Sequence, residues 1–265
     1  MKATIGMVGV PIETVFVRTD DDYLIDVIEA YTPGATKNIR EFLNKADESR
    51  AQGINLIDLG ELSFGITAGR NYYHREVSEW ERKSLTDITL DMLLEERGKL
   101  LAKKDDFDVL LCIGLSHFGA LLLYEDSDFV VRADCHGDYF KKDKEKHIGA
   151  NYASYMNTVE RKFSNARILN YGVRTNFGSE TMDFYGEMGD INCIEHVNAN
   201  HFDIDVDCFA KELMMSSSRN CSNLLPAQIE SMAAEARPRK IGIWEYRINY
   251  DSGNGRKFIE NVVFS

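Results

Sequence analysis

The chain has 265 residues, of which 44% are hydrophobic and 28% charged, and its formal net charge is −12. This length suits an α/β protein with a sizeable core, and the composition is that of a soluble globular protein. The acidic balance argues against nucleic acid as the main partner, because phosphate contacts need basic side chains. The longest apolar stretch, residues 109–124, contains Ser116 and His117 and is too short to span a bilayer comfortably, so we expect no membrane partner.

Five cysteines occur along the chain without a Cys-x-x-Cys motif. An odd number with no tight framework predicts free thiols in a reducing cytoplasm. The N-terminal run MKATIGMVGVPIE has a single lysine and predicts a first strand rather than a signal peptide. We therefore expect a cytoplasmic protein.

Apolar runs of strand type recur along the chain, and several are apolar on both faces, as in strands buried between helical layers. They cover residues 4–10, 54–60, 108–114, 129–134, 167–173, 191–197, 201–206 and 240–246. Helical patterns lie between them at residues 36–47, 76–104, a turn or two after His117, 149–163 and 226–238. This alternation predicts one domain over residues 1–265: an α/β fold of three layers, with a mostly parallel sheet and helices on both faces. Residues 213–226 are expected to form a surface loop near the active-site edge.

The run VVRADCHGDYF (130–140) places Asp134, His136 and Asp138 at alternate positions directly after two valines. In an extended segment these three side chains project to the same side. Two carboxylates and an imidazole crowded on one side would repel or desolvate each other unless a cation lay between them. The triplet therefore indicates a metal site.

Further acids and histidines follow the ends of other predicted strands, where open α/β sheets bind their ligands. His117 follows the strand at 108–114, Asp203 and Asp205 end the strand at 201–206, and Glu245 ends the last strand. With the triplet, these strands supply four carboxylates and two imidazoles for metal. Such an oxygen-rich set suits Mn²⁺, and to a lesser degree Mg²⁺, iron or cobalt, whereas structural zinc would favour cysteine. Six ligands suit two ions that share bridging carboxylates, so we expect two Mn²⁺ per chain, with other divalent ions possible.

Four blocks occur in a fixed order: GLSH (114–117), DCHGD (134–138), DID (203–205) and WEYR (244–247). In these blocks, and in GVPIE (9–13) and PGATKNIR (33–40), the chain resembles the ureohydrolases, the family of arginase, agmatinase and formimidoylglutamase. The resemblance covers nearly the whole chain. It implies metal-dependent hydrolysis of a C–N bond in a linear guanidine or amidine. It also implies a homo-oligomer, either a trimer or a hexamer.

The resemblance also implies a role for each site residue. One ion would be held by His117, Asp134, Asp138 and Asp203, and the other by His136, Asp134, Asp203 and Asp205. Glu245 would pair with the cationic substrate and aim its carbon at a metal-bound hydroxide. The competing interpretation of Glu245 is a surface acid paired with Arg247.

Departures from the family pattern bear on the substrate. Arginases use an asparagine where this chain has Phe140, and an acid near the place of Phe177, so both polar contacts to free arginine are missing. Formimidoylglutamases often have an arginine just after the triplet, and Tyr139 stands there. The histidine that is thought to shuttle protons is replaced around Asn151, and His147 is close enough to substitute as a catalytic residue.

These observations favour a dinuclear manganese hydrolase that releases urea from an agmatine-like guanidino compound. Arginase or formimidoylglutamase activity is the alternative within the family. A non-catalytic metal-binding protein is an alternative of a different class. An amide deacetylase with one zinc, held by two aspartates and one histidine, is a further alternative.

Overall fold

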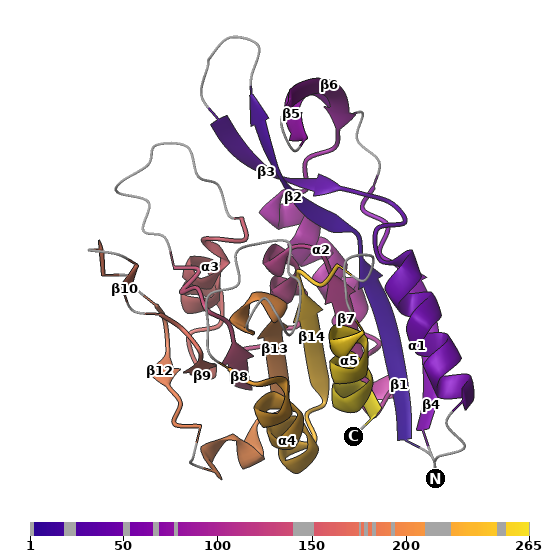
Figure 1. The fold of residues 1–265 in the computed structure, drawn as a ribbon, viewed down its shortest axis with the longest axis vertical. Helices are drawn as coiled ribbons and strands as arrows, with labels where there is room; N and C mark the ends of the chain where they lie inside the picture. Colours follow the sequence, from indigo (N-terminus) through magenta and orange to yellow (C-terminus); the bar gives the residue numbers. More distant parts are fainter. Residues whose placement is uncertain are drawn as a thin grey trace.

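A computed structural model describes residues 3–18, 25–49, 54–65, 69–76, 79–139, 151–174, 176–177, 180–181, 184–191, 194–209, 224–247 and 253–264. Its centre is an eight-stranded sheet in the order β12-β9-β8-β13-β14-β7-β1-β4, in which every neighbouring pair is parallel (Figure 1). The strands are β1 (Ala3–Val10), β4 (Ile54–Glu61), β7 (Val109–Gly114), β8 (Phe129–Ala133), β9 (Arg167–Tyr171), β12 (Glu187–Met188), β13 (His201–Asp205) and β14 (Lys240–Trp244). Most of the predicted strands are thus confirmed.

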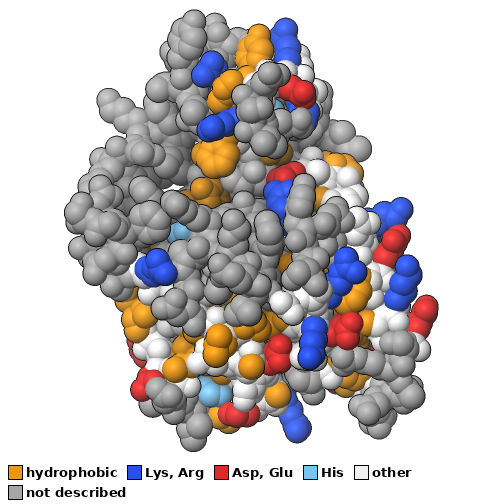
Figure 2. All heavy atoms as spheres, viewed as in Figure 1, with side chains coloured by type: hydrophobic (Ala, Val, Ile, Leu, Met, Phe, Trp, Pro, Cys, Tyr) orange, Lys and Arg blue, Asp and Glu red, His pale blue; other side chains and the backbone are white. Residues whose placement is uncertain are grey.

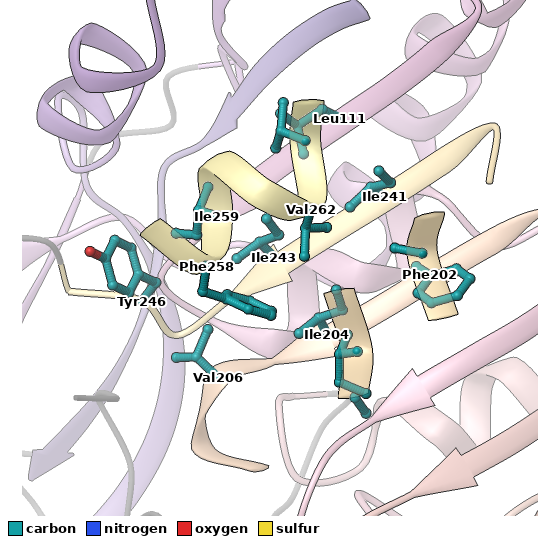
Figure 3. Packing of buried hydrophobic residues seen from close by; sticks show 14 of the residues in the cluster. Leu111, Phe202, Ile204, Val206, Ile241, Ile243, Tyr246, Phe258, Ile259 and Val262 are labelled. Atoms are coloured by element: carbon teal, nitrogen blue, oxygen red, sulfur yellow. The ribbon is translucent and has the colours of Figure 1, made fainter. Parts of the chain in front are cut away.

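Helices cover both faces of this sheet. One face packs against α1 (Lys37–Ser49), α4 (Pro226–Ala236) and α5 (Asn254–Phe264), and the other against α2 (Leu90–Leu101), the 3-10 helix η2 (His117–Leu122) and α3 (Tyr155–Lys162). The first interface is an apolar cluster in which Ile204 and Ile243 of the sheet meet Phe258 and Val262 of α5 (Figure 3). The predicted three-layer α/β architecture is therefore confirmed.

The pleat of β13 separates apolar from polar side chains. Phe202 and Ile204 enter the apolar cluster under α4 and α5, whereas His201, Asp203 and Asp205 alternate with them and point to the other face. All five residues are buried. Because a buried polar group must be hydrogen-bonded or charge-compensated, the second face of the sheet has to supply partners for these side chains.

A second sheet, antiparallel and in the order β3-β2-β5-β6, lies at the top of Figure 1, beyond the carboxyl ends of the parallel strands. Its strands are β2 (Ile12–Arg18), β3 (Ile25–Tyr31), β5 (Arg70–Glu76) and β6 (Glu79–Leu85). The predicted helix over 76–104 is wrong in its first half, because residues 79–85 pair with β5. The helix begins only at Leu90, where the Thr89 hydroxyl accepts a hydrogen bond from the Met92 amide and caps the first turn.

Two other expectations differ from the structure. The predicted strand at 191–197 is wrong: its described part is the 3-10 helix η3 (Ile194–Asn198), which contains the buried imidazole of His196. The helical pattern at 149–163 begins later, at Tyr155. The sequence pattern missed α5, and also a short hairpin of β10 (Asn176–Phe177) and β11 (Glu180–Thr181).

Charged side chains of both signs are interspersed on the side of Figure 2 where Figure 1 shows α1. The pairs Lys37–Glu41 (3.7 Å) and Arg40–Asp58 (2.6 Å) lie along this helix and the neighbouring β4. Among the described residues, no helix is both long enough and apolar enough to cross a membrane. Of the 213–226 loop, only residues 224–226 are described.

Candidate metal centre

Four neighbouring strands bring the candidate site residues to one edge of the parallel sheet. In the order β8-β13-β14-β7, each strand ends beside the next, and the site residues follow these ends. His117 begins η2 after β7, the segment from Asp134 to Asp138 follows β8, Asp205 ends β13, and Glu245 follows β14. The predicted convergence of these side chains is thus present in the structure.

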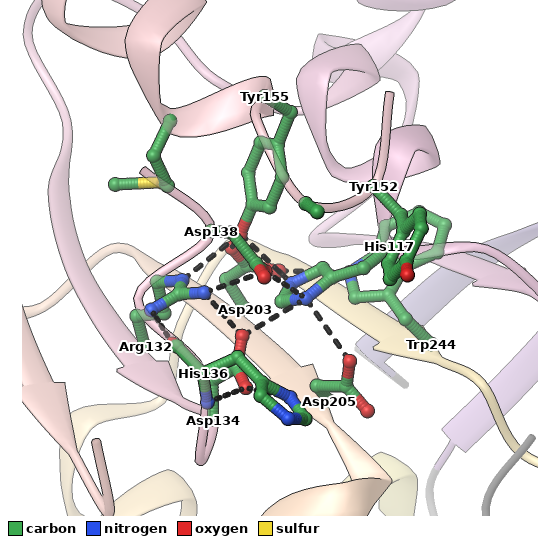
Figure 4. A network of polar contacts seen from close by, with 12 residues as sticks. His117, Arg132, Asp134, His136, Asp138, Tyr152, Tyr155, Asp203, Asp205 and Trp244 are labelled. Atoms are coloured by element: carbon green, nitrogen blue, oxygen red, sulfur yellow. Dashed lines mark hydrogen bonds and ion pairs between the residues drawn. The ribbon is translucent and has the colours of Figure 1, made fainter. Parts of the chain in front are cut away.

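The imidazole of His117 lies at the centre of the group and is fully buried. Its Nδ1 atom is 3.1 Å from a carboxylate oxygen of each of Asp134, Asp138 and Asp205 (Figure 4). None of these oxygens forms a hydrogen bond with Nδ1. Donor atoms of His117, Asp134 and Asp138 lie within 4.8 Å of one another, so these three residues could hold one divalent cation.

The opposite edge of the same imidazole faces Asp203. His117 Nε2 is 3.1 Å from Asp203 Oδ1, and Asp203 also accepts hydrogen bonds from the Tyr124 hydroxyl (2.7 Å), the Tyr155 hydroxyl (3.0 Å) and the Trp244 indole (2.8 Å). Both oxygens of Asp203 therefore have hydrogen-bond partners other than the three carboxylates that face His117 Nδ1. Burial opposes ionisation of Asp203, but His117, His201 and Arg132 outweigh it and hold the pKa of this carboxyl well below its usual range, so the carboxylate accepts a hydrogen bond from Nε2. Burial disfavours the charged form of His117, but Tyr155, Asp203 and the facing carboxylates outweigh it and raise the pKa of the imidazole well above its usual range. A cation bound at Nδ1 would therefore displace a proton.

Glycines make room for the Trp244 indole. A Cβ atom on Gly242 would lie 2.6 Å from the indole Nε1, and one on Gly119 would lie 2.7 Å from the ring. A Cβ on Gly114 would approach the ring to 3.0 Å. These positions let the indole lie under His117 and reach Asp203.

Arg132 extends into the site from β8, and its guanidinium is fully buried. Nη2 donates to the Oδ2 atoms of both Asp134 and Asp138, the latter at 2.8 Å. Arg132 and His117 approach these two carboxylates from opposite sides (Figure 4). The site therefore contains a fixed positive charge beside its acids.

A second group of donors lies around His136. Its Nδ1 atom is 2.7 Å from Asp207 Oδ2, and its backbone amide donates to Asp134 Oδ1 at 2.7 Å. Donor atoms of Asp134, His136 and Asp207 lie within 4.8 Å of one another, as do those of Asp205, Asp207 and Glu245. Asp207 is fully buried, and it was not among the residues that the sequence pattern singled out.

Cys135 lies between these donors in the sequence, but its sulfur is bonded in a disulfide and is not a thiolate ligand. The expectation of free thiols is therefore wrong for Cys135. Cys112 and Cys208 are free and buried.

Glu245 is buried, and its backbone adopts a left-handed conformation with φ of 61°. Its amide donates to the Gly114 carbonyl at 3.0 Å, which fixes the residue beside β7. Arg247 pairs instead with Glu13 at 2.7 Å. Burial thus contradicts the interpretation of Glu245 as a surface acid. The predicted catalytic residue His147 lies outside the described residues.

The substrate-selecting positions are only partly described. Phe140 lies outside the described residues, and only the backbone of Phe177 is described, in β10. Asn151 is buried before α3, where its side-chain oxygen accepts a hydrogen bond from the Ala153 amide at 3.0 Å.

The charges of the site perturb its carboxyl groups in opposite directions. Burial opposes ionisation of Asp134, but Arg132 and His117 outweigh it and hold the pKa of this carboxyl well below its usual range. Burial and the neighbouring charge of Asp134 raise the pKa of Asp138 to about 6. The fixed cation therefore does not offset all the negative charge of the pair.

The His136 side of the site shows the same excess of negative charge. Burial, followed by the charges of Asp207 and Glu245, raises the pKa of Asp205 well above its usual range. Burial disfavours the imidazolium of His136, yet the contact with Asp207 raises its pKa to about 10. Protons held by such a cluster are released when a divalent cation takes their place.

Several residues that shape the site had a signal in the sequence that could have found them. Asp207 continues the alternation in FDIDVD, and Arg132 stands two positions before Asp134, on the same side of its strand. The supporting side chains Tyr124 and Tyr155 had no such signal, because they lie outside the motifs, whereas Trp244 begins the block WEYR and ends β14.

No family model and no curated protein matches the sequence. Solved structures do match the fold. An agmatine ureohydrolase of Thermoplasma volcanium has a TM-score of 0.65 and 14% identity, covering 99% of this chain and 89% of that one. A Trypanosoma cruzi formiminoglutamase variant with Mn²⁺ has a TM-score of 0.64 and 15% identity, over 98% and 92% of the two chains. The arginase of Bacillus caldovelox has a TM-score of 0.59 and 14% identity, over 100% and 97%.

The chain has the ureohydrolase fold. The fold expected from the four sequence blocks is thus confirmed over almost the whole chain. At 12–15% identity, these matches concern the fold.

Proposed function

We propose that this chain with a ureohydrolase fold is a metal-dependent hydrolase that cleaves the C–N bond of a linear guanidine or amidine. The observation that carries the proposal is the environment of His117 Nδ1. This buried nitrogen has no hydrogen bond and lies 3.1 Å from oxygens of Asp134, Asp138 and Asp205. A buried imidazole nitrogen that faces three carboxylates is suited to bind a cation in place of a proton, and the names of the matched structures support the substrate class.

The donor set fits a pair of ions of the manganese type, since it consists of carboxylates and imidazoles without a thiolate. In this proposal, His117, Asp134, Asp138 and Asp205 hold one ion, and His136, Asp134, Asp205 and Asp207 hold the other. The assignment differs from the sequence-based one in the aspartates of β13 and the turn after it. Asp205 would take the bridging place expected for Asp203, and Asp207 the place expected for Asp205. Asp203 instead accepts hydrogen bonds at the opposite edge of the His117 ring.

When bound, the ions would lower the pKa of a water molecule so that hydroxide forms near neutral pH. The residues of the chain then have separate tasks. With an ion bound, Asp203 would keep the remaining His117 proton on Nε2, so that Nδ1 can present its lone pair. Glu245 accepts N–H bonds from the planar cation of the substrate and orients its central carbon. Burial of the site strengthens each of these charge interactions.

The substrate proposed is an agmatine-like guanidino compound, with urea as a product. The sequence offers no polar residue at positions 140 and 177 for the amino-acid end of free arginine, and burying those charges unpaired would cost several kcal/mol. His147 is proposed as the residue that transfers protons, and a trimer or hexamer as the assembly. Arginase or formimidoylglutamase activity is the alternative substrate choice.

The non-catalytic alternative has one observation in its favour, which is the guanidinium of Arg132 among the proposed ligands. Turnover decides between the two. We would load metal-free protein with Mn²⁺ and measure urea release from arginine, agmatine, guanidinobutyrate and guanidinopropionate, and formamide release from formimidoylglutamate. We expect the wild type to release urea from a compound that lacks an α-amino acid end, and Asp134→Asn to release none. No release from any compound by metal-loaded protein would refute the hydrolase proposal.

A further inference from the structure

Arg132 is unusual because every N–H of its buried guanidinium has a partner. Nε donates to the Tyr155 hydroxyl at 2.9 Å, and Nη1 donates to the His136 carbonyl (3.0 Å) and to Asn170 Oδ1 (3.2 Å). Nη2 donates to the two carboxylates of the site. A guanidinium held on all sides is a built part of the site, because no donor is left to favour another orientation.

The carboxylate oxygens that Nη2 contacts are the ones proposed to bind an ion. Oδ2 of Asp134 and Oδ2 of Asp138 each lie 3.1 Å from His117 Nδ1, and the same two atoms accept the hydrogen bonds of Arg132 Nη2. A divalent ion among these donors would compete with Nη2 for both oxygens. The guanidinium is permanently protonated, so the ion would also meet a positive charge that does not leave by deprotonation.

The ion position at His136 lacks this conflict. Arg132 reaches His136 only through the backbone carbonyl, and the imidazole faces Asp207 at 2.7 Å. The oxygen of Asp134 nearest to this position is Oδ1, whereas Nη2 contacts Oδ2. The two proposed positions therefore differ in how closely the guanidinium approaches them.

We propose that Arg132 is a resident cation that makes the two ion positions unequal: the His136 position fills first, and the His117 position fills only at higher metal concentration. This inference rests on the metal centre of the proposed function. Entry of the second ion requires Nη2 to give up its contacts with Asp134 and Asp138. The remaining bonds to Tyr155 and Asn170 keep the guanidinium buried nearby, so its charge continues to oppose the second ion.

The same contact has a role before any ion is bound. Acids buried together destabilise a fold unless a positive charge compensates them. In the metal-free protein, the guanidinium provides that charge for Asp134 and Asp138. Arg132 would thus allow the chain to fold first and take up metal afterwards.

The test is a Mn²⁺ titration of metal-free wild type, Arg132→Met and Lys240→Met. Bound ions are counted by equilibrium dialysis, and electron paramagnetic resonance distinguishes isolated from spin-coupled Mn²⁺. Lys240 is the matched control, because it is another buried cation on this face, with Nζ 2.5 and 2.7 Å from the oxygens of Asp128 at the opposite end of the strands.

For wild type we expect two affinities that differ on the order of 100-fold, with an isolated Mn²⁺ signal after the first equivalent. Arg132→Met should bind the second ion at least about tenfold more tightly and show the coupled signal earlier, with the first affinity within about threefold of wild type. Lys240→Met should titrate like wild type. A wild type that never binds the second ion while Arg132→Met does would support the same conclusion.

Two equal affinities in wild type would overturn the inference. So would an unchanged second affinity in Arg132→Met, or an equal gain in Lys240→Met. If Arg132→Met fails to fold, Arg132→Gln and the wild-type titration decide. Absence of turnover in protein with both ions bound would refute the proposed hydrolase and leave the order of filling intact. Equal affinities with normal turnover would refute only the role of Arg132.

Discussion

The Nε2 atom of His117 lies 3.1 Å from Asp203 Oδ1, on the edge of the imidazole that faces away from Asp134 and Asp205. Asp203 therefore acts on the candidate site through the histidine. A ligand and its orienting partner differ in what their loss does to metal binding. Removal of a ligand takes away a donor, whereas loss of the orienting carboxylate frees the ring and its proton, typically at a cost of about 10–100-fold in metal affinity.

Metal analysis of Asp203→Asn and Asp207→Asn should separate these roles. We expect Asp207→Asn to lose the ion at His136, because the carboxylate 2.7 Å from the imidazole is gone. Asp203→Asn should still bind both ions, with the affinity at His117 about 10–100-fold weaker. Equilibrium dialysis against Mn²⁺ measures both. Loss of both ions in Asp203→Asn, with Asp207→Asn unaffected, would restore Asp203 as the bridging ligand.

Glu245→Gln should lower kcat/KM by about thirty- to a thousandfold, roughly 2–4 kcal/mol of transition-state stabilisation. The amide keeps the size of the side chain but loses the charge that pairs with a guanidinium. Glu13→Gln is the control, because Glu13 pairs with the partly exposed Arg247 and should change kcat/KM little. Metal content is measured in parallel. Lost metal in Glu245→Gln would make this residue a ligand, and full activity would remove it from the site.

Gly242→Ala should destabilise the fold by about 1–3 kcal/mol, because the new Cβ would lie 2.6 Å from the buried Trp244 Nε1. The displaced indole would also leave Asp203 without one of its donors. Gly98→Ala is the matched control: it lies in α2 with open space around its Cβ position and should stabilise the protein by about 0.5–1 kcal/mol. Chemical denaturation compares the two. Equal stability of both variants would show that the indole adapts.

Asp128→Asn tests the buried ion pair beneath the site. Burial raises the pKa of Asp128, but His201 and Lys240 outweigh it and hold the value at about 2. A depressed carboxyl pKa stabilises the fold above the unfolded pKa of about 4, and this contribution disappears as the pH falls through 2. At pH 7 we expect Asp128→Asn to be less stable by about 2 kcal/mol. The difference from wild type should shrink between pH 4 and pH 2, and a difference independent of pH would exclude the ion pair as its cause.

The sequence was sufficient to predict the sheet and the edge that carries the site, because buried parallel strands are apolar on both faces and end in conspicuous acids. It was not sufficient for the ligand assignment within FDIDVD. Asp203, Asp205 and Asp207 all lie on one side of an extended segment, so alternation alone cannot tell which pair reaches the rim. The end of β13 and the turn after it place Asp207 beside His136, which supports the proposed assignment.

The errors in the secondary structure have a related cause. Residues 79–85 are charged and amphipathic, and only pairing with β5 makes them a strand. Such pairing between segments is not visible in local periodicity. Arg132 was overlooked although alternation places it on the same side as Asp134, because its partners Tyr155 and Asn170 come from other elements.

Asp138 and Glu245 both have left-handed backbones, with φ of 45° and 61°. A residue other than glycine in this conformation lowers the stability of the fold by about 1 kcal/mol or more. Glu245→Gly would relieve that strain while deleting the carboxylate, so a screen for heat resistance alone should enrich it. Selection for stability alone would then replace residues at this edge of the sheet first. Libraries built for thermostability would have to keep positions 138 and 245 unchanged.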